Sequence, residues 1–176
     1  MKLLLLTSSA LLWGGIVFFT LSCNPEPSTT DPEIPFTGVT LMDENGGSLD
    51  VSDPSDWRLD DIWVAQEKAL FPATKDLKNC PSDPTLEAYA CAPNPTPGRL
   101  FLGYHLPDSM EVDVCNVDRD FKALNRWDAA GLGPGYNLIV FDMDSIPLKD
   151  TIRVYYQIRR PGVACAFRGH GDVILK

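Results

Sequence analysis

The chain has 176 residues, a formal net charge of −9 and 44% hydrophobic residues. This length accommodates about one domain besides an export segment. The acidic balance argues against nucleic acid as a partner and against electrostatic docking on anionic lipid.

The N-terminus predicts export. Residues 3–21 carry no charged side chain, and this apolar run follows Lys2 and leads into Ser22 and Cys23. The arrangement resembles a bacterial lipoprotein signal, which implies that residues 1–22 are removed and that Cys23 becomes the lipidated first residue. An uncleaved membrane anchor and an ordinary cleaved signal are the alternatives, and each of them exports the chain.

Residues 23–35 are expected to form a flexible tether, because prolines recur and few side chains can pack. Residues 36–176 are then expected to form a single domain held at the membrane through the lipid on Cys23. The lipoprotein resemblance places this domain in a bacterial cell envelope, at the outer membrane, on either its periplasmic or its outer face.

One helix is expected at about residues 54–71. Asp53 can cap it, Pro54 suits the first helical position, and Pro72 ends it. Apolar residues recur at three- and four-residue spacing on one face. The opposite face is polar, so the helix is expected to pack on one side only.

From Leu86 onward, alternating apolar and polar residues predict short strands with turn signals between them. Residues 138–141 form a short apolar run that is typical of a buried strand, and Gly169-His170-Gly171 is expected to form a turn between two last strands. The pattern predicts a mainly β fold, an immunoglobulin-like β-sandwich with one packed α-helix.

The C-terminal part also resembles a known family. Pro93-Asn94-Pro95 leads through Pro97-Gly98 into a strand over residues 99–106, and the chain ends in Val-Ile-Leu-Lys. These features are similar to the immunoglobulin-like sorting domains of type IX secretion cargo. The resemblance implies the same sandwich fold and a secretion-associated role.

Four cysteines follow Cys23 in the chain. In an exported protein, Cys80, Cys91, Cys115 and Cys165 predict two disulfides with three possible connectivities. The preferred pairing joins Cys80 to Cys91 and Cys115 to Cys165. Zinc is disfavoured because no closely spaced cysteine pair occurs.

Candidate binding residues are aromatic or lie near the second histidine. Exposed tryptophan and tyrosine side chains stack on sugars and anchor protein partners. His170 between two glycines is expected to be accessible, and Asp172 could orient its ring. The candidates are Trp57, Trp127, Tyr136, Tyr155, His170 and Asp172.

No catalytic constellation is complete, because no Gly-x-Ser-x-Gly nucleophile accompanies His170. No metal or other cofactor is expected. The sequence therefore favours a lipid-anchored binding or structural module for an envelope protein or a glycan. The alternatives are an envelope hydrolase with a site near His170 and a secretion-associated sorting-like domain.

Overall fold

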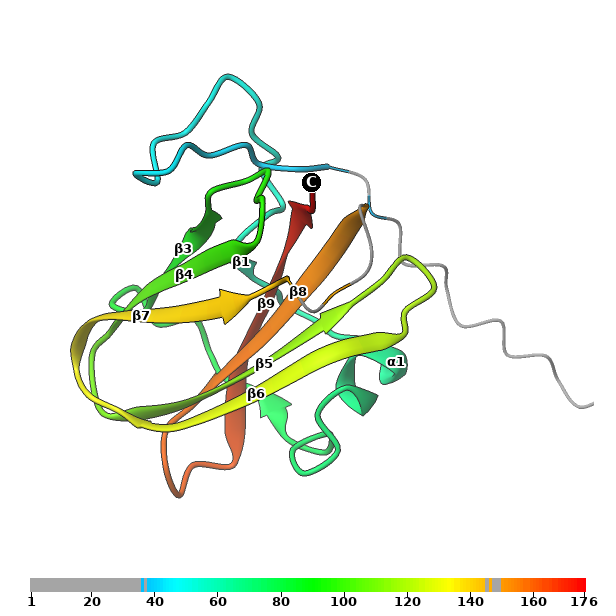
Figure 1. Cartoon of the computed structure of the whole chain (residues 1–176). Helices are drawn as coiled ribbons and strands as arrows, with labels where there is room; N and C mark the ends of the chain where they lie inside the picture. The colour runs from blue at the N-terminus through cyan, green and yellow to red at the C-terminus, as the bar shows by residue number, and fades with distance from the viewer. Residues whose placement is uncertain (1–35, 37, 145, 147–149) are drawn as a thin grey trace, which may run out of the picture. The chain divides into compact units, whose positions relative to one another are not determined.

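The computed structural model describes residues 36, 38–144, 146 and 150–176, all within a unit that spans residues 33–176 (Figure 1). The predicted signal, Cys23 and the tether lie outside the described residues. Among the described residues, no helix combines the length and the hydropathy needed to cross a bilayer.

Strands dominate the described part of the chain, and its single helix is short. The elements in chain order are β1 (Arg58–Leu59), α1 (Ala65–Ala69), β2 (Lys78–Asn79), β3 (Glu87–Ala92), β4 (Arg99–Leu106), β5 (Met110–Val117), β6 (Ala123–Leu132), β7 (Gly135–Asp142), β8 (Thr151–Arg159) and β9 (Cys165–Ile174). The prediction of a mainly β fold is confirmed.

The strands form two sheets. The larger has the order β1-β9-β8-β5-β6, and β2 pairs in parallel with β9. The smaller has the order β3-β4-β7, and every pairing in it is antiparallel. In the view of Figure 1, β3, β4 and β7 lie at the left and α1 lies at the right, beside β5 and β6.

The inward faces of the two sheets share one hydrophobic core. The predicted stripe of β4, from Leu100 to Leu106 at alternate positions, is fully buried there. The facing side chains on β5, β8 and β9 include Val114, Tyr156 and Phe167. Because β-strand side chains alternate between faces, the intervening side chains of β4 and β7 point away from this core.

The long helix predicted at 54–71 is wrong, because α1 has only five residues. Trp57 has a positive φ of 59°, and its N–H donates to the His170 carbonyl at 2.8 Å. Leu59 then pairs with Gly169 in β1. Pairing with the edge of β9 therefore overrides the helical pattern, and Ile62 of the predicted apolar stripe is 80% exposed.

The turn predicted at Gly169-His170-Gly171 is also wrong, because these residues lie inside the continuous strand β9. A Cβ atom at Gly169 would collide with the Arg58 carbonyl, and one at Gly171 would collide with the Trp57 ring. The glycines therefore allow close approach of the segment that contains β1, which is a common role of glycine inside a strand.

Candidate functional site

The predicted binding aromatics do not form one surface. Trp57 and Tyr155 are buried, and the Tyr155 hydroxyl donates to Glu67 at 3.0 Å. Trp127 is half-buried, with its ring centroid 4.5 Å from that of Phe141. Tyr136 alone of the four predicted aromatics is well exposed, at 67%.

His170 is held by Asp60 rather than by Asp172. Its Nδ1 atom lies 2.9 Å from Asp60 Oδ2, which also accepts the Trp63 indole N–H at 2.7 Å. Asp172 is buried and forms a two-pronged ion pair with Arg153, at 2.7 and 2.8 Å. The expectation that Asp172 orients His170 is wrong, because the two residues are successive outward positions of β9 with different partners.

The C-terminal basic residues are engaged in the same manner. Arg159 contacts Asp113 at 2.9 Å, and Arg160 contacts Asp83 at 2.7 Å. Together with the Arg153–Asp172 pair, these contacts link neighbouring strands and loops. The Arg153 and Arg159 pairs therefore join neighbouring strands of the larger sheet.

An apolar surface instead lies on the outward face of β3-β4-β7. We call it the apolar sheet face and define it by Ala92, Phe101, Tyr136, Leu138 and Val140. Leu138 and Val140 are 50% and 51% exposed. In register, Leu138 lies beside Gly103, and Val140 lies beside Phe101.

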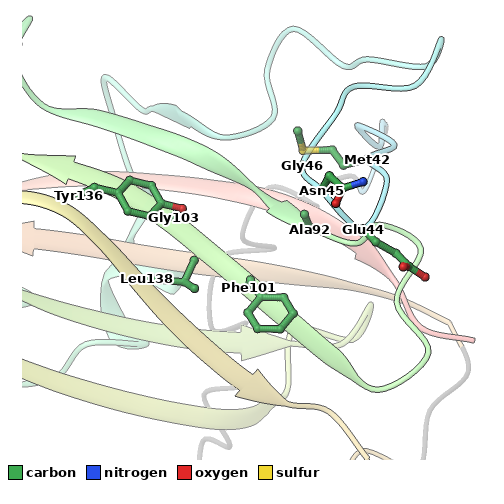
Figure 2. Close-up of a pocket in the computed structure, with 9 residues that line it drawn as sticks. All are labelled: Met42, Glu44, Asn45, Gly46, Ala92, Phe101, Gly103, Tyr136 and Leu138. Atoms are coloured by element: carbon green, nitrogen blue, oxygen red, sulfur yellow. The ribbon is translucent and has the colours of Figure 1, made fainter.

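Gly103 shapes this face. A Cβ atom at Gly103 would lie 2.9 Å from the Tyr136 hydroxyl and 3.4 Å from its ring carbons. The ring therefore lies across β4 at the one position that has no side chain, as Figure 2 shows. A shallow pocket of about 480 Å³ extends from Tyr136 and Leu138 to Met42 and the following loop (Figure 2).

The loop that closes this pocket is anchored by buried hydrogen bonds. Met42 and Asn94 exchange two backbone hydrogen bonds of 2.9 Å. The Asn94 amide donates to the carbonyls of Thr40 and Asp172, both at 2.8 Å. One wall of the pocket is therefore tied to β9.

Asp56 completes the anchor. Its carboxylate accepts the backbone N–H groups of Thr40 and Asp172, at 2.7 and 2.8 Å. Burial nevertheless raises the pKa of Asp56 to about 6, because removal from water disfavours the charged form more than these hydrogen bonds favour it. The anchor therefore changes protonation in the mildly acidic range.

The sequence carries a signal for this face. The apolar run at 138–141 predicts a buried strand, and continuous apolar runs are typical of strands covered on both faces. Ile139 and Phe141 do point into the core, whereas Leu138 and Val140 face outward and are half exposed. A strand with the composition of an interior strand thus has one side uncovered.

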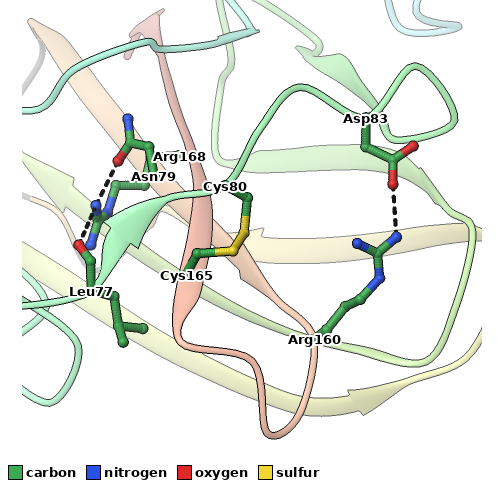
Figure 3. The surroundings of a disulfide bond; sticks show 7 residues. All are labelled: Leu77, Asn79, Cys80, Asp83, Arg160, Cys165 and Arg168. Atoms are coloured by element: carbon green, nitrogen blue, oxygen red, sulfur yellow. Dashed lines mark hydrogen bonds and ion pairs between the residues drawn. A yellow bond between two sulfur atoms is a disulfide. The ribbon is translucent and has the colours of Figure 1, made fainter.

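The predicted disulfide pairing is wrong. The structure joins Cys80 to Cys165 (Figure 3). Cys91 and Cys115 are left as buried thiols. Cys80 follows β2, whose parallel pairing sets Lys78 beside Cys165. Cys91 faces the core between the sheets and Cys115 faces Tyr155 on the other side of β5, so neither lies near the bridge.

The Cys80–Cys165 bridge closes a chain separation of 85 residues. Restriction of the unfolded chain over that length contributes about 4–5 kcal/mol in the loop-entropy description. The bridge fixes β2 to the start of β9, next to the Asp83–Arg160 ion pair (Figure 3). It is a structural cross-link within the larger sheet, whereas the apolar sheet face belongs to the smaller one.

Other chemistry has little support in the described residues. They contain no cluster of three or more histidine, cysteine, aspartate or glutamate side chains suited to a metal ion. His170 does not line the pocket between Met42 and Tyr136, the pocket between Asp60 and Arg168, or the pocket between Thr74 and Asp128. Among the described residues, the apolar sheet face therefore remains as the candidate binding surface.

Comparison with protein-family models, with curated proteins and with solved structures finds no match for this chain.

Proposed function

We propose that this protein is a lipid-anchored module of the bacterial cell envelope that binds a partner protein through the apolar sheet face. In this proposal, Cys23 carries the lipid, residues 23–35 form the tether, and the two sheets form an immunoglobulin-like sandwich. The support for the anchor is the sequence pattern of residues 1–23.

The observation that carries the binding proposal is the outward face of β7. Tyr136, Leu138 and Val140 are each at least half exposed and lie in a row on one strand. Contiguous exposed apolar surface on a soluble domain is typical of interaction sites. Covering these side chains would contribute on the order of 1 kcal/mol for each of them.

A protein partner is favoured over a glycan. Sugar binding usually relies on several exposed aromatic rings, and Tyr136 is the one predicted aromatic that is well exposed. The aliphatic neighbours Leu138 and Val140 offer dispersion contacts but no hydrogen bonds to hydroxyl groups. A hydrolase site near His170 is disfavoured because His170 lines none of the three pockets named above.

Site-specific photo-cross-linking in the cell tests the binding proposal. Replacement of Tyr136 by p-benzoylphenylalanine is expected to give one discrete protein adduct, and the adduct should vanish when Leu138→Glu is added. The matched control carries the same cross-linker at Ile62, which is 80% exposed but lies far along the chain from β7. Identical adducts from both positions, or no adduct from position 136, would refute the proposal.

Labelling with a palmitate analogue tests the anchor separately. The wild-type protein is expected to incorporate the label, and Cys23→Ala is expected to lose it. Label that persists in Cys23→Ala would show that Cys23 is not the site of lipidation.

A further inference from the structure

β7 forms one of the two edges of the smaller sheet, and β3 forms the other. Among the residues that the structure describes, β7 pairs with β4 and with no other strand. The Met143 N–H donates to the Gly98 carbonyl at 2.7 Å, and this pair continues the β4–β7 register. Since antiparallel pairs alternate, the odd-numbered residues of β7 direct their backbone groups toward β4.

The even-numbered residues of β7 therefore direct their N–H and C=O groups away from β4. Leu138 and Val140 are in this set, and their side chains also form part of the apolar sheet face. Within the described part of the chain, the same two residues thus present both backbone groups without a strand partner and half-exposed apolar side chains. An edge of this kind is a template for one more strand.

We propose that β7 binds an extended segment of another protein as an added β-strand, with apolar side chains at alternate positions lying on the apolar sheet face. This inference rests on the proposed function and names the form of the partner. Backbone hydrogen bonds to Leu138 and Val140 supply register, and alternate side chains supply selectivity. A helix has no deep groove to enter here, because the face is a shallow surface around Phe101 and Tyr136.

Charge distinguishes the partner segment from a second copy of this chain. The exposed carboxylate of Glu44 lines the pocket beside the apolar sheet face, and the exposed Asp142 lies opposite Arg99 at the end of that face. The whole chain has a net charge of −9. A second copy would bring acidic borders together, whereas a segment with lysine or arginine at its ends complements them.

A peptide array tests the inference with the purified full chain. The probes are ten-residue peptides with valine, isoleucine, leucine or tyrosine at alternate positions, threonine between them and lysine at both ends. A second set carries glutamate at both ends. We expect binding to members of the lysine set, at least tenfold weaker binding to their glutamate counterparts, and weakening of the lysine set by added salt.

Two variants at one position isolate the backbone contribution. Val140→Ala removes most of the side chain and keeps the N–H group, whereas Val140→Pro also removes the N–H group. Proline is tolerated where the N–H faces away from the neighbouring strand, so both variants should fold, as near-ultraviolet circular dichroism will verify. We expect Val140→Pro to bind the selected peptides at least tenfold more weakly than Val140→Ala.

The added-strand proposal would be overturned by either of two results. One is equal peptide binding by Val140→Pro and Val140→Ala, and the other is that no lysine-ended peptide binds the wild type more tightly than it binds the variants. A dimer in sedimentation equilibrium that Val140→Pro dissociates would overturn the choice of partner. The cross-linking adduct from position 136 is independent of these outcomes. If that adduct persists equally in Val140→Pro and Val140→Ala, the apolar sheet face binds a partner but not as a strand.

Discussion

The two consecutive strands β6 and β7 each lie at a sheet edge, yet they present different chemistry. Among the described residues, β6 pairs with β5 alone and β7 pairs with β4 alone. The outward positions of β6 include the exposed Arg126 and Asp128, whereas those of β7 are Tyr136, Leu138 and Val140. Charges on an edge strand oppose pairing with another chain. The contrast indicates that association is suppressed at one edge and permitted at the other.

The inward side chains of the two strands also differ, because those of β7 are more deeply buried than those of β6. Phe141 of β7 is fully buried, and Trp127 of β6 is half-buried against it. The strand with the apolar outer side is therefore also the one held more firmly by the core. Its exposed side chains are presented on a rigid support, which lowers the entropic cost of binding.

The largest expected effect comes from removing that support. Phe141→Ala should lower the free energy of unfolding by about 3–5 kcal/mol, because a buried ring is replaced by a cavity. Trp127→Ala should cost less, because part of that ring already contacts water. Urea denaturation of both variants checks the order, and a larger loss for Trp127→Ala would contradict the contrast between the two inner sides.

Making the β7 edge resemble the β6 edge should abolish binding without unfolding the domain. In the double variant Leu138→Lys with Val140→Lys, we expect the cross-linking adduct from position 136 to fall at least a hundredfold, which corresponds to about 2.7 kcal/mol. The melting temperature should change little, because both side chains are half exposed. A matched variant with lysine at Ile62 should leave the adduct unchanged, and loss of the adduct there would point to a general charge effect.

The β7 side also differs in having an anchored loop beside it, and this anchor should respond to pH. Because the pKa of Asp56 is raised from 3.8 to about 6 in the folded state, the folded state binds more protons than the unfolded state between these values. Stability from this group is therefore present at low pH and is lost as the pH rises through about 6. The loss should reach at most about 3 kcal/mol at neutral pH.

Asp56→Asn isolates this contribution. The variant cannot ionise, so its free energy of unfolding relative to wild type should rise between pH 4 and pH 7. Comparison at each pH removes the shared effects of other carboxylates, such as Asp83, whose pKa is lowered to about 2 by Thr85 and Arg160. A constant difference between the two proteins across that range would show that Asp56 is already ionised at pH 4.

The sequence predicts some of these strand faces but not the exposed face of β7. The alternation of apolar residues in β4 from Leu100 to Leu106 predicts its buried face correctly, because these side chains all lie in the core. The run at 138–141 does not reveal which of its apolar residues remain uncovered, since that depends on the sheet order. Cys80 meets Cys165 for a similar reason, through the parallel pairing of β2 with β9.

The helix prediction failed for a related physical reason. Leu59 and Trp63 have helical spacing, but the N–H of Trp57 bonds to His170, more than a hundred residues later. Local propensity amounts to a few tenths of a kcal/mol per residue, whereas edge pairing adds several hydrogen bonds and buries Trp57. Of the candidate binding aromatics, only Tyr136 is well exposed. Trp57 and Tyr155 are buried by contacts between parts of the chain that are distant in sequence, and local patterns do not reveal such contacts.

The smallest expected effect concerns the shape of the β7 side rather than its charge. Gly103→Ala places a methyl group 2.9 Å from the Tyr136 hydroxyl, so the ring must move away from β4. Stability should change by less than about 1 kcal/mol, because the clash is with the far end of a side chain and alanine restricts the unfolded backbone. Gly133→Ala is the matched control between the two edges, since its Cβ would meet no atom within 4 Å. We expect the Tyr136 ring resonances in NMR spectra to shift in Gly103→Ala alone, together with several-fold weaker partner binding. Unchanged Tyr136 resonances would mean that the ring does not rest on Gly103. In that case the outer side of β7 would differ from that of β6 in the polarity of its side chains and not in its shape, and the surface beside Gly103 would play no part in selecting the partner.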